Sequence, residues 1–450
     1  MKRALKSSAI LLLLILLISG GNAFSQQTVS VSLKQARDIA AERAYTVRQA
    51  NADIETARFQ VKELTATGLP QVNATIGFND NIGLPVQLVP GDFFGQPGQD
   101  IEVQFGTKYS GNAGLNVNQL VFSGTYLVGL QAAKAFVEKS REDQAKTVVD
   151  IRKTVSEAYF LVLATEESIK IIDSTYAITK KLADETRIIF ENGLVEETDY
   201  DQLQLMTSEL EVSRTNALNQ LSIARSYLKY HMGLPETTEI VLTQSIAELI
   251  DETKPAVLMD ESFNLNSNID FRILKKQQEL AFLQLRQQKS LYLPSLSAFL
   301  NYQTQAQRAE WDFFDSKGKW YSSSVWGVNM NIPIFSSGER KAKVNQAKVQ
   351  VEKTMIAEEQ VGNSLKIQYQ NTSNELRNAL LTYGTTRQNR ALSEKIFRRT
   401  GVKYQEGISG SLDLMNAHNQ YLSTQSQYIN AAMNVLNKSV ALESLTEIPE

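Results

Sequence analysis

Apolar residues recur at steps of three and four along two long stretches of the chain, the pattern of amphipathic helices. In the first stretch, from about residue 126 to residue 190, they include Val148, Ile151, Val155 and Ile169. Proline, which interrupts helix interiors, is absent from residue 98 to residue 234 and from residue 334 to residue 448. At about 1.5 Å per residue, about 60 helical residues extend roughly 90 Å. The pattern predicts coiled-coil-like helices in a rod or tube.

Each long helical stretch stops at a glycine and is followed by a second helical stretch. Gly193 and Gly407 stand at these two stops, where glycine readily adopts the left-handed conformation of a helix C-cap. We expect Thr198 to cap the first returning helix and Ser411 to begin the second. Each half of the chain is therefore predicted to contain a long antiparallel helical hairpin.

A different pattern, with period two, precedes each hairpin. Val72, Ala74, Ile76 and Phe78 alternate with polar residues, and similar but looser alternation occurs near residues 115–122, 296–300 and 325–332. Such alternation predicts strands with one apolar and one wet face. Each half thus supplies two strands, and a further helix is expected before them, over about 32–67 and about 268–292.

The two halves also resemble each other in sequence. Residues 137–139, Val-Glu-Lys, recur 214 residues later as residues 351–353, and Phe190-x-x-Gly193 recurs at the same separation as Tyr404-x-x-Gly407. Upstream the separation is 224, so one loop of the first half is about ten residues longer. The expected organisation is a signal peptide over 1–25, a first repeat over 26–238, a linker or equatorial segment over 239–267 and a second repeat over 268–450.

The first residues have the character of a secretory signal. Three cations precede an apolar run over residues 10–18, and Ala23-x-Ser25 offers a cleavage site before Gln26. The alternative is an uncleaved anchor, for which the run is short. The chain has no cysteine, which excludes disulfides, thiolate metal sites and lipid attachment through cysteine. Without the three cations the formal charge changes from −3 to −6, which argues against a nucleic-acid partner.

Aromatic residues gather around the loop between the two strands of the second half. They are Trp311, Trp320, Tyr321 and Trp326. Tryptophan and tyrosine favour the interface between membrane and water, so we expect these four to be membrane-interface residues. The alternatives are a small sandwich core or exposed loop aromatics. If the strands span a membrane, four cannot close a barrel, so two chains would have to share eight strands or three chains twelve.

Catalytic chemistry finds little support in the sequence. The two histidines, His231 and His418, are far apart, and each stands alone on a helical pattern. No phosphate-binding loop, dinucleotide glycine motif or nucleophile elbow is present. We therefore expect no enzyme activity, no catalytic residue, no cofactor and no metal site.

The order of these features resembles the TolC-like outer-membrane efflux proteins along almost the whole mature chain. Residues 122–124, Phe-Ser-Gly, and residues 335–338, Phe-Ser-Ser-Gly, are similar to the strand-to-helix junction of that family. The segment Gly193-Leu194-x-x-x-Thr198-Asp199 is similar to its hairpin tip. The resemblance implies a mainly α-helical, internally duplicated protein with a small transmembrane β part. Three chains would form an α-barrel of long helical hairpins, capped by a shared barrel of twelve strands.

Function and partners follow from the same resemblance. It implies the outer-membrane exit duct of a tripartite efflux or type I secretion system, with a long periplasmic extension. Its partners would be two copies of itself, a periplasmic adaptor protein, an inner-membrane transporter of the RND or ABC type, and outer-membrane lipid. The tip residues that would contact the adaptor are Gly193, Leu194, Thr198, Gly407 and Ile408. The periplasmic gate would use Asp199, Tyr404 and Asp413.

Two positions depart from the best-known members of the family. Ser409 stands where they have an arginine that links coils in the closed state, and Asn416 stands where they have a second acidic residue. The closing contacts of this chain must therefore differ from theirs. A different class of function is a periplasmic coiled-coil scaffold or adhesion protein without a channel, but such a rod does not need two aromatic-flanked β-hairpins.

Overall fold

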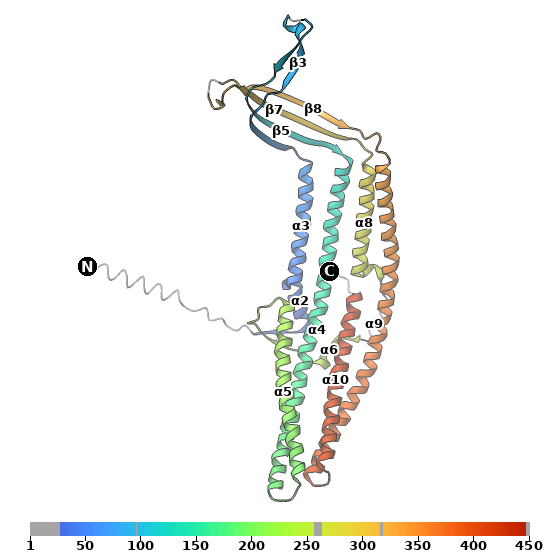
Figure 1. The fold of residues 1–450 in the computed structure, drawn as a ribbon. Coiled ribbons are helices and arrows are strands. Elements are labelled where there is room, and N and C mark those ends of the chain that lie inside the picture. Colours follow the sequence, from blue (N-terminus) through green and yellow to red (C-terminus); the bar gives the residue numbers. More distant parts are fainter. Residues whose placement is uncertain (1–27, 96, 256–262, 316–317, 447–450) are drawn as a thin grey trace, which may run out of the picture. The chain divides into compact units, whose positions relative to one another are not determined.

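The computed structural model describes residues 28–95, 97–255, 263–315 and 318–446, so the expected signal peptide lies outside the described residues. The described residues form two compact units (Figure 1). A helical unit takes its described residues from 28–49, 146–264 and 366–446, and a sheet unit takes its described residues from 50–145 and 265–365. Each unit therefore draws segments from both halves of the sequence.

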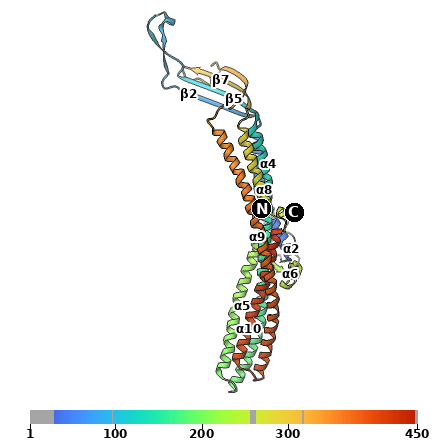
Figure 2. The same ribbon diagram turned by 90° about the vertical axis from the view of Figure 1, so that its right-hand side faces the viewer.

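Four helices dominate the helical unit, and the two long ones begin in the sheet unit. They are α4 (Gly124–Glu191), α5 (Glu197–Met232), α9 (Glu339–Gln405) and α10 (Ser411–Thr446). Their lengths of 68, 36, 67 and 36 residues repeat in the two halves. Within the helical unit they lie alongside one another (Figure 2). Large side chains from all four fill its core, among them Tyr159, Leu228, Leu376 and Leu436.

Part of the predicted linker over 239–267 is folded into this core. Its strand β6 (Glu239–Leu242) pairs in parallel with β1 (Thr28–Val31), and its helix α6 (Ile246–Thr253) lies against α10. The side chain of Ser245 caps α6 and that of Glu248 returns the bond, which satisfies backbone donors at the helix start. The segment is thus a structural part of the helical unit as well as a connection.

The helix expected over about 32–67 is interrupted. Helix α2 (Leu33–Arg43), which begins with a capping box at Ser32, ends at Ala44, and α3 (Tyr45–Thr67) follows directly. Gly233, which ends α5 with φ +68°, lies so close that an added Cβ would stand 2.3 Å from the carbonyl oxygen of Arg43. The interruption lies where the backbone of Gly233 packs against that of Arg43 and Ala44, a contact that sequence periodicity does not reveal.

The sheet unit is built around a four-stranded antiparallel sheet in the order β2-β5-β7-β8. The strands are β2 (Gln71–Asp80), β5 (Tyr109–Ser123), β7 (Ser295–Arg308) and β8 (Tyr321–Asn331). The two central strands come from different halves of the sequence, so each predicted hairpin contributes one central and one edge strand. The short turn η2 (Leu265–Ser267) and helix α8 (Ile269–Ser290), capped by Asn268, precede β7.

The longer loop of the first half forms a small hairpin of its own. Strands β3 (Val86–Pro90) and β4 (Asp100–Gln104) pair as a separate two-stranded sheet, with the short turn η1 (Gly91–Phe94) between them (Figure 1). This hairpin accounts for the extra residues between β2 and β5. Across the described residues, each helix is either too short or too polar to cross a membrane.

Candidate functional site

The tips of the two helical hairpins have the same backbone turn. At the end of α4, the Gly193 N–H donates to the Phe190 carbonyl at 2.8 Å, and the Leu194 N–H donates to the Ile189 carbonyl at 3.1 Å. The same two bonds recur 214 residues later, at the end of α9. The Gly407 N–H donates to the Tyr404 carbonyl at 3.0 Å, and the Ile408 N–H donates to the Lys403 carbonyl at 2.8 Å. This pair of bonds is the Schellman motif, which needs a left-handed residue. Gly193 and Gly407 supply it, with φ of +75° and +69°.

Each tip presents one apolar side chain to solvent directly after its glycine. Leu194 is 77% exposed and Ile408 is 75% exposed. Thr198, also expected at the tip, is exposed, but the prediction that it caps α5 is wrong. The N-cap is Glu196, two residues earlier, and it makes no side-chain cap bond. The Thr198 hydroxyl instead donates to the Glu196 carboxylate at 3.3 Å. The acidic first turn, with Glu197 and Asp199, stabilises this helix end through its dipole.

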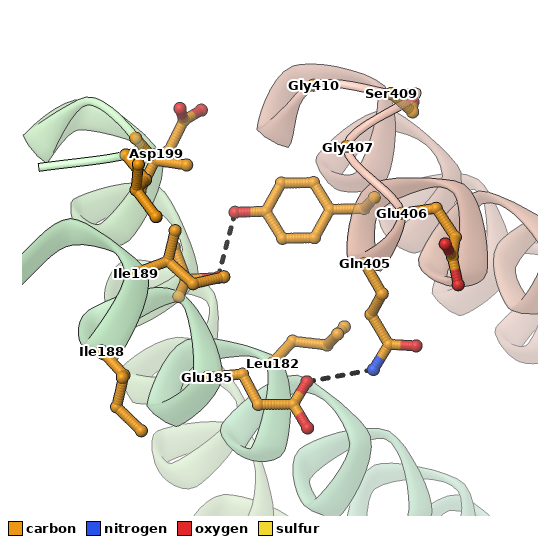
Figure 3. Close-up of a pocket in the computed structure, with 14 residues that line it drawn as sticks. Leu182, Glu185, Ile188, Ile189, Asp199, Gln405, Glu406, Gly407, Ser409 and Gly410 are labelled. Carbon is orange, nitrogen blue, oxygen red and sulfur yellow. Dashed lines mark hydrogen bonds between the residues drawn. The ribbon is translucent and has the colours of Figure 1, made fainter. Parts of the chain in front are cut away.

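Between the two tips lies a cavity of about 800 Å³. Two hydrogen bonds join α4 to α9 along its lining (Figure 3). The Tyr404 hydroxyl lies 3.1 Å from Thr186 Oγ1, and Gln405 Nε2 donates to Glu185 Oε2 at 3.0 Å. The predicted gate residues Asp199 and Tyr404 both line this cavity. The first and second hairpins of one chain are therefore linked near their tips.

A further bond links the returning helices. The hydroxyl of Ser411, at the start of α10, donates to Asp199 Oδ1 in the first turn of α5. Asp413 stands apart from this contact: its carboxylate is exposed and accepts a hydrogen bond of 2.9 Å from Ser409. Ser409 thus bonds within its own tip rather than across to another helix.

Burial is the main influence on the titration of Tyr404. It raises the pKa of the phenol, the negative charge of Asp199 raises it further, and the bond to Thr186 opposes the change. Tyr404 is therefore uncharged at neutral pH, and its bond to Thr186 joins two neutral hydroxyl groups. The linkage can form and break without a change in charge.

The sequence analysis did not single out Thr186, Glu185 or Gln405. Thr186 is 2% exposed on α4, four residues after the buried Leu182. A polar residue at a core position of the helical pattern is a signal that could have identified it, because buried hydroxyls need partners. Glu185 and Gln405 show no such signal, because surface pairs between distant helices leave no local pattern.

The four aromatic residues predicted at the membrane interface do not lie on one surface. In the loop after β7, Trp311 and Trp320 pack against Phe313, with ring centroids 5.1 and 6.2 Å apart. Trp326, on β8, is exposed beside its cross-strand partner Leu300. Tyr321 pairs with Gln305 and so points to the opposite face from Trp326. Tyr321 therefore does not share the apolar surface on which Trp326 lies.

Known proteins resemble the chain in sequence and fold. The family model described as "Outer membrane efflux protein" matches residues 36–234 and 264–446. The outer membrane protein TolC of Vibrio cholerae serotype O1 is 22% identical over 280 residues, 62% of this chain but only 59% of that protein, so less than two thirds of it is covered. The outer membrane efflux protein BepC of Brucella suis biovar 1 is 21% identical over 349 residues, 75% of this chain and 72% of that protein. The fold matches that of the outer membrane protein VceC of Vibrio cholerae with a TM-score of 0.68 at 15% identity, covering 93% of this chain and 97% of that one.

Proposed function

The chain belongs to the outer membrane efflux protein family, and we propose that it is the exit duct of a tripartite efflux or type I secretion system. In this role it conducts cargo passively from an inner-membrane pump, through a periplasmic tunnel, across the outer membrane. It has no catalytic role in this proposal. The repeats over 26–238 and 268–450 supply equivalent parts of the duct, and residues 1–25 direct export.

The observation that carries this proposal is the open four-stranded sheet. Its order leaves β2 and β8 with one unpaired edge each within the described chain. One face carries apolar side chains such as Val72, Val117 and Trp326 in register, and the other carries mostly polar ones. Unpaired edges are not tolerated in lipid, so a membrane role requires further strands from other copies. Three copies close a barrel of twelve strands.

Exposed apolar residues on two helices of the helical unit also favour assembly. On α5, Leu205, Val212 and Ile223 are more than half exposed at spacings of seven and eleven residues, which keeps them on one helix face. On α9, Leu381 and Leu392 are similarly exposed at a spacing of eleven. Large exposed apolar stripes mark interaction surfaces. We assign them to contacts between copies in a trimeric α-barrel.

The hairpin tips are proposed to bind a periplasmic adaptor protein. Leu194 and Ile408 are exposed apolar residues held on identical rigid turns, which suits contact with an apolar partner surface. Gly193, Gly407 and Thr198 shape or flank the same turns. The gate uses Asp199 and Tyr404, linked across the hairpins, and three copies of Asp413, which would form an anionic ring with weak affinity for divalent cations.

Expression with membrane fractionation and bilayer recording tests the channel. We expect the protein in the outer-membrane fraction, as a trimer that dissociates on heating, and as discrete conductance steps in planar lipid bilayers. A monomer that stays in the soluble fraction and gives no conductance would refute the channel and favour the scaffold. Trimers in the membrane without conductance, under conditions that open known channels, would refute the passive duct.

In-cell photo-crosslinking tests the partner. A photoreactive residue replaces Leu194 in one variant and Ile408 in another, and captured proteins are identified by mass spectrometry. The matched control places the same residue at Val212, which is exposed on α5 but away from the tip. We expect the tip variants to capture an adaptor and the control to capture copies of this chain. Capture of only this chain, or of nothing, by folded and abundant tip variants would refute the tip assignment.

A further inference from the structure

The register of the four-stranded sheet collects uncharged polar side chains on one face, here called the amide face. Asn73, Asn116 and Asn301 stand side by side on three neighbouring strands, because Asn73 pairs with Asn116 and Asn116 pairs with Asn301. Two residues further along, Gln303 pairs with Ser323 of β8, and beyond it Gln305 pairs with Tyr321. Side chains alternate between faces, so these positions share one surface. Two apolar side chains also lie on it, Val325 beside Asn301 and Phe299 beside Asn118.

The opposite surface, here called the apolar face, carries large apolar side chains together with a group of hydroxyl residues around Thr304 and Ser322. Val72, Val117, Leu300 and Trp326 form one row of cross-strand partners on it. Near one end of the sheet the row consists of Phe78, Gly111 and Ala306.

The loop after β7 folds over this end of the apolar face. Phe313 is only 4% exposed, and its ring centroid lies 5.1 Å from that of Phe78. A Cβ at Gly111 would stand 2.9 Å from the Phe313 ring, so the glycine makes room for it. Phe313 and Trp311 of this loop therefore pack on the apolar face.

Charge is confined to one end of these strands. Within β2, β5, β7 and β8 the charged residues are Asp80 and Arg308, and both pair with Tyr109. Because side chains alternate, Asp80 and Arg308 lie on the apolar face, at its end. The amide face carries no formal charge along its paired length. Amide groups offer both donors and acceptors, so they can solvate anions and cations alike.

We propose that the amide face lines the passage and that the sheet admits hydrogen-bonding, hydrated cargo of either charge sign. This inference rests on the proposed channel function. Rings of charged side chains give a pore its ionic selectivity, and a lining without them lacks that discrimination. Any preference of the whole channel for one sign of charge then arises outside the sheet, for example at the carboxylates of the hairpin tips.

The natural absence of cysteine provides a clean test by site-directed thiol labelling. Gln303→Cys places a thiol on the amide face, and Thr304→Cys places one on the apolar face of the same strand. Ser409→Cys, beside Asp413, is the tip comparison. Each full-length variant is recorded in planar bilayers while a cationic methanethiosulfonate, bearing trimethylammonium, or an anionic one, bearing sulfonate, is added. Reaction rates are divided by those of the same reagents with free 2-mercaptoethanol.

We expect the thiol at residue 303 to react with both reagents, changing the current, at normalised rates within about threefold of each other. The thiol at residue 304 should react with neither from the aqueous side. At residue 409 the cationic reagent should be favoured about tenfold or more, since confined carboxylates concentrate cations. As a second readout, Gln303→Lys and Gln303→Glu should shift the reversal potential in a salt gradient in opposite directions.

Three outcomes would overturn the inference while leaving the channel intact. The first is a strong preference for one reagent at residue 303. The second is reaction at residue 304 instead of residue 303, which would reverse the two faces. The third is normal conductance without reaction at either residue, which would place the conducting path away from the sheet. A wild-type protein that never conducts would instead count against the proposed function itself.

Discussion

The Tyr404 hydroxyl lies 3.1 Å from Thr186 Oγ1, although 218 residues separate the two along the chain. Thr186 is buried on α4, and burial raises the pKa of Tyr404 on α9. The bond therefore joins neutral partners that both line the cavity between the tips. It ties the first hairpin to the second without an ion pair.

Removing this bond is expected to loosen the tips. Tyr404→Phe deletes one hydroxyl and leaves Thr186 buried without its partner, a loss of about 1 kcal/mol. We expect a lower thermal midpoint of the protein and, for the proposed trimeric channel, a higher mean conductance in planar bilayers. Thr186→Val and the double variant complete a double-mutant cycle. Strict additivity of the two single effects, on both stability and conductance, would show that the bond does not couple the hairpins.

The contact between Ser411 and Asp199 should also help to close the tips. Ser411→Ala removes the donor to a carboxylate, which is worth about 1.5–3 kcal/mol for a charged acceptor. Exposure of part of that carboxylate to water reduces the effect. We expect increased conductance and easier proteolysis near residues 193–199. Ser409→Ala is the control, because its bond to Asp413 lies within one tip. Equal effects of the two variants would contradict a specific link between hairpins.

Acid is expected to destabilise the helical unit through His418. Its side chain is 3% exposed, stands edge-on to Phe397 at 5.6 Å, and burial lowers its pKa to about 4. As the pH falls, His418 is thus protonated at a lower pH in the folded state than in the unfolded state, where its pKa is near 6.5. Stability is therefore full above about pH 6.5 and falls as the pH drops toward 4, by up to about 3 kcal/mol.

Thermal midpoints measured from pH 7.5 to pH 4.5 check this expectation. His418→Leu should flatten the part of the pH dependence between 6.5 and 4. His231 is the second histidine, half-buried, with a pKa that burial also lowers, and His231→Leu is the comparison. A pH profile unchanged by His418→Leu would assign the acid sensitivity to the carboxylates of the chain.

Alanine at the tip glycines should be costly for conformational reasons alone. At Gly193 and Gly407 an added Cβ would meet no atom within 4 Å, but both residues have positive φ. We expect each substitution to cost about 1–2 kcal/mol. Gly401→Ala, in the interior of α9 with equally open space, should instead stabilise by up to about 1 kcal/mol. Thermal unfolding of the three variants gives the comparison, and a neutral Gly407→Ala would contradict a rigid turn.

Several features were predictable because their signals are local. The glycine turns, the long helices and the strands follow from caps and from periods of 3.6 and two residues. The expected cap at Thr198 was wrong because the acidic turn around Glu196 and Glu197 starts the helix without a side-chain cap. Alternation along each strand also determined which of its residues share a face, and hence which residues each strand contributes to the amide face.

Only the tertiary structure decided which of these local features meet. It placed β5 beside β7, strands from different halves, and so aligned Asn116 with Asn301. It paired Tyr404 with Thr186 and Asp199 with Ser411, and it left Asp413 with Ser409. The physical reason is range: periodicity and capping act over a few residues of one segment. Contacts between residues some 200 positions apart depend on how whole elements pack, and a single sequence does not display that packing.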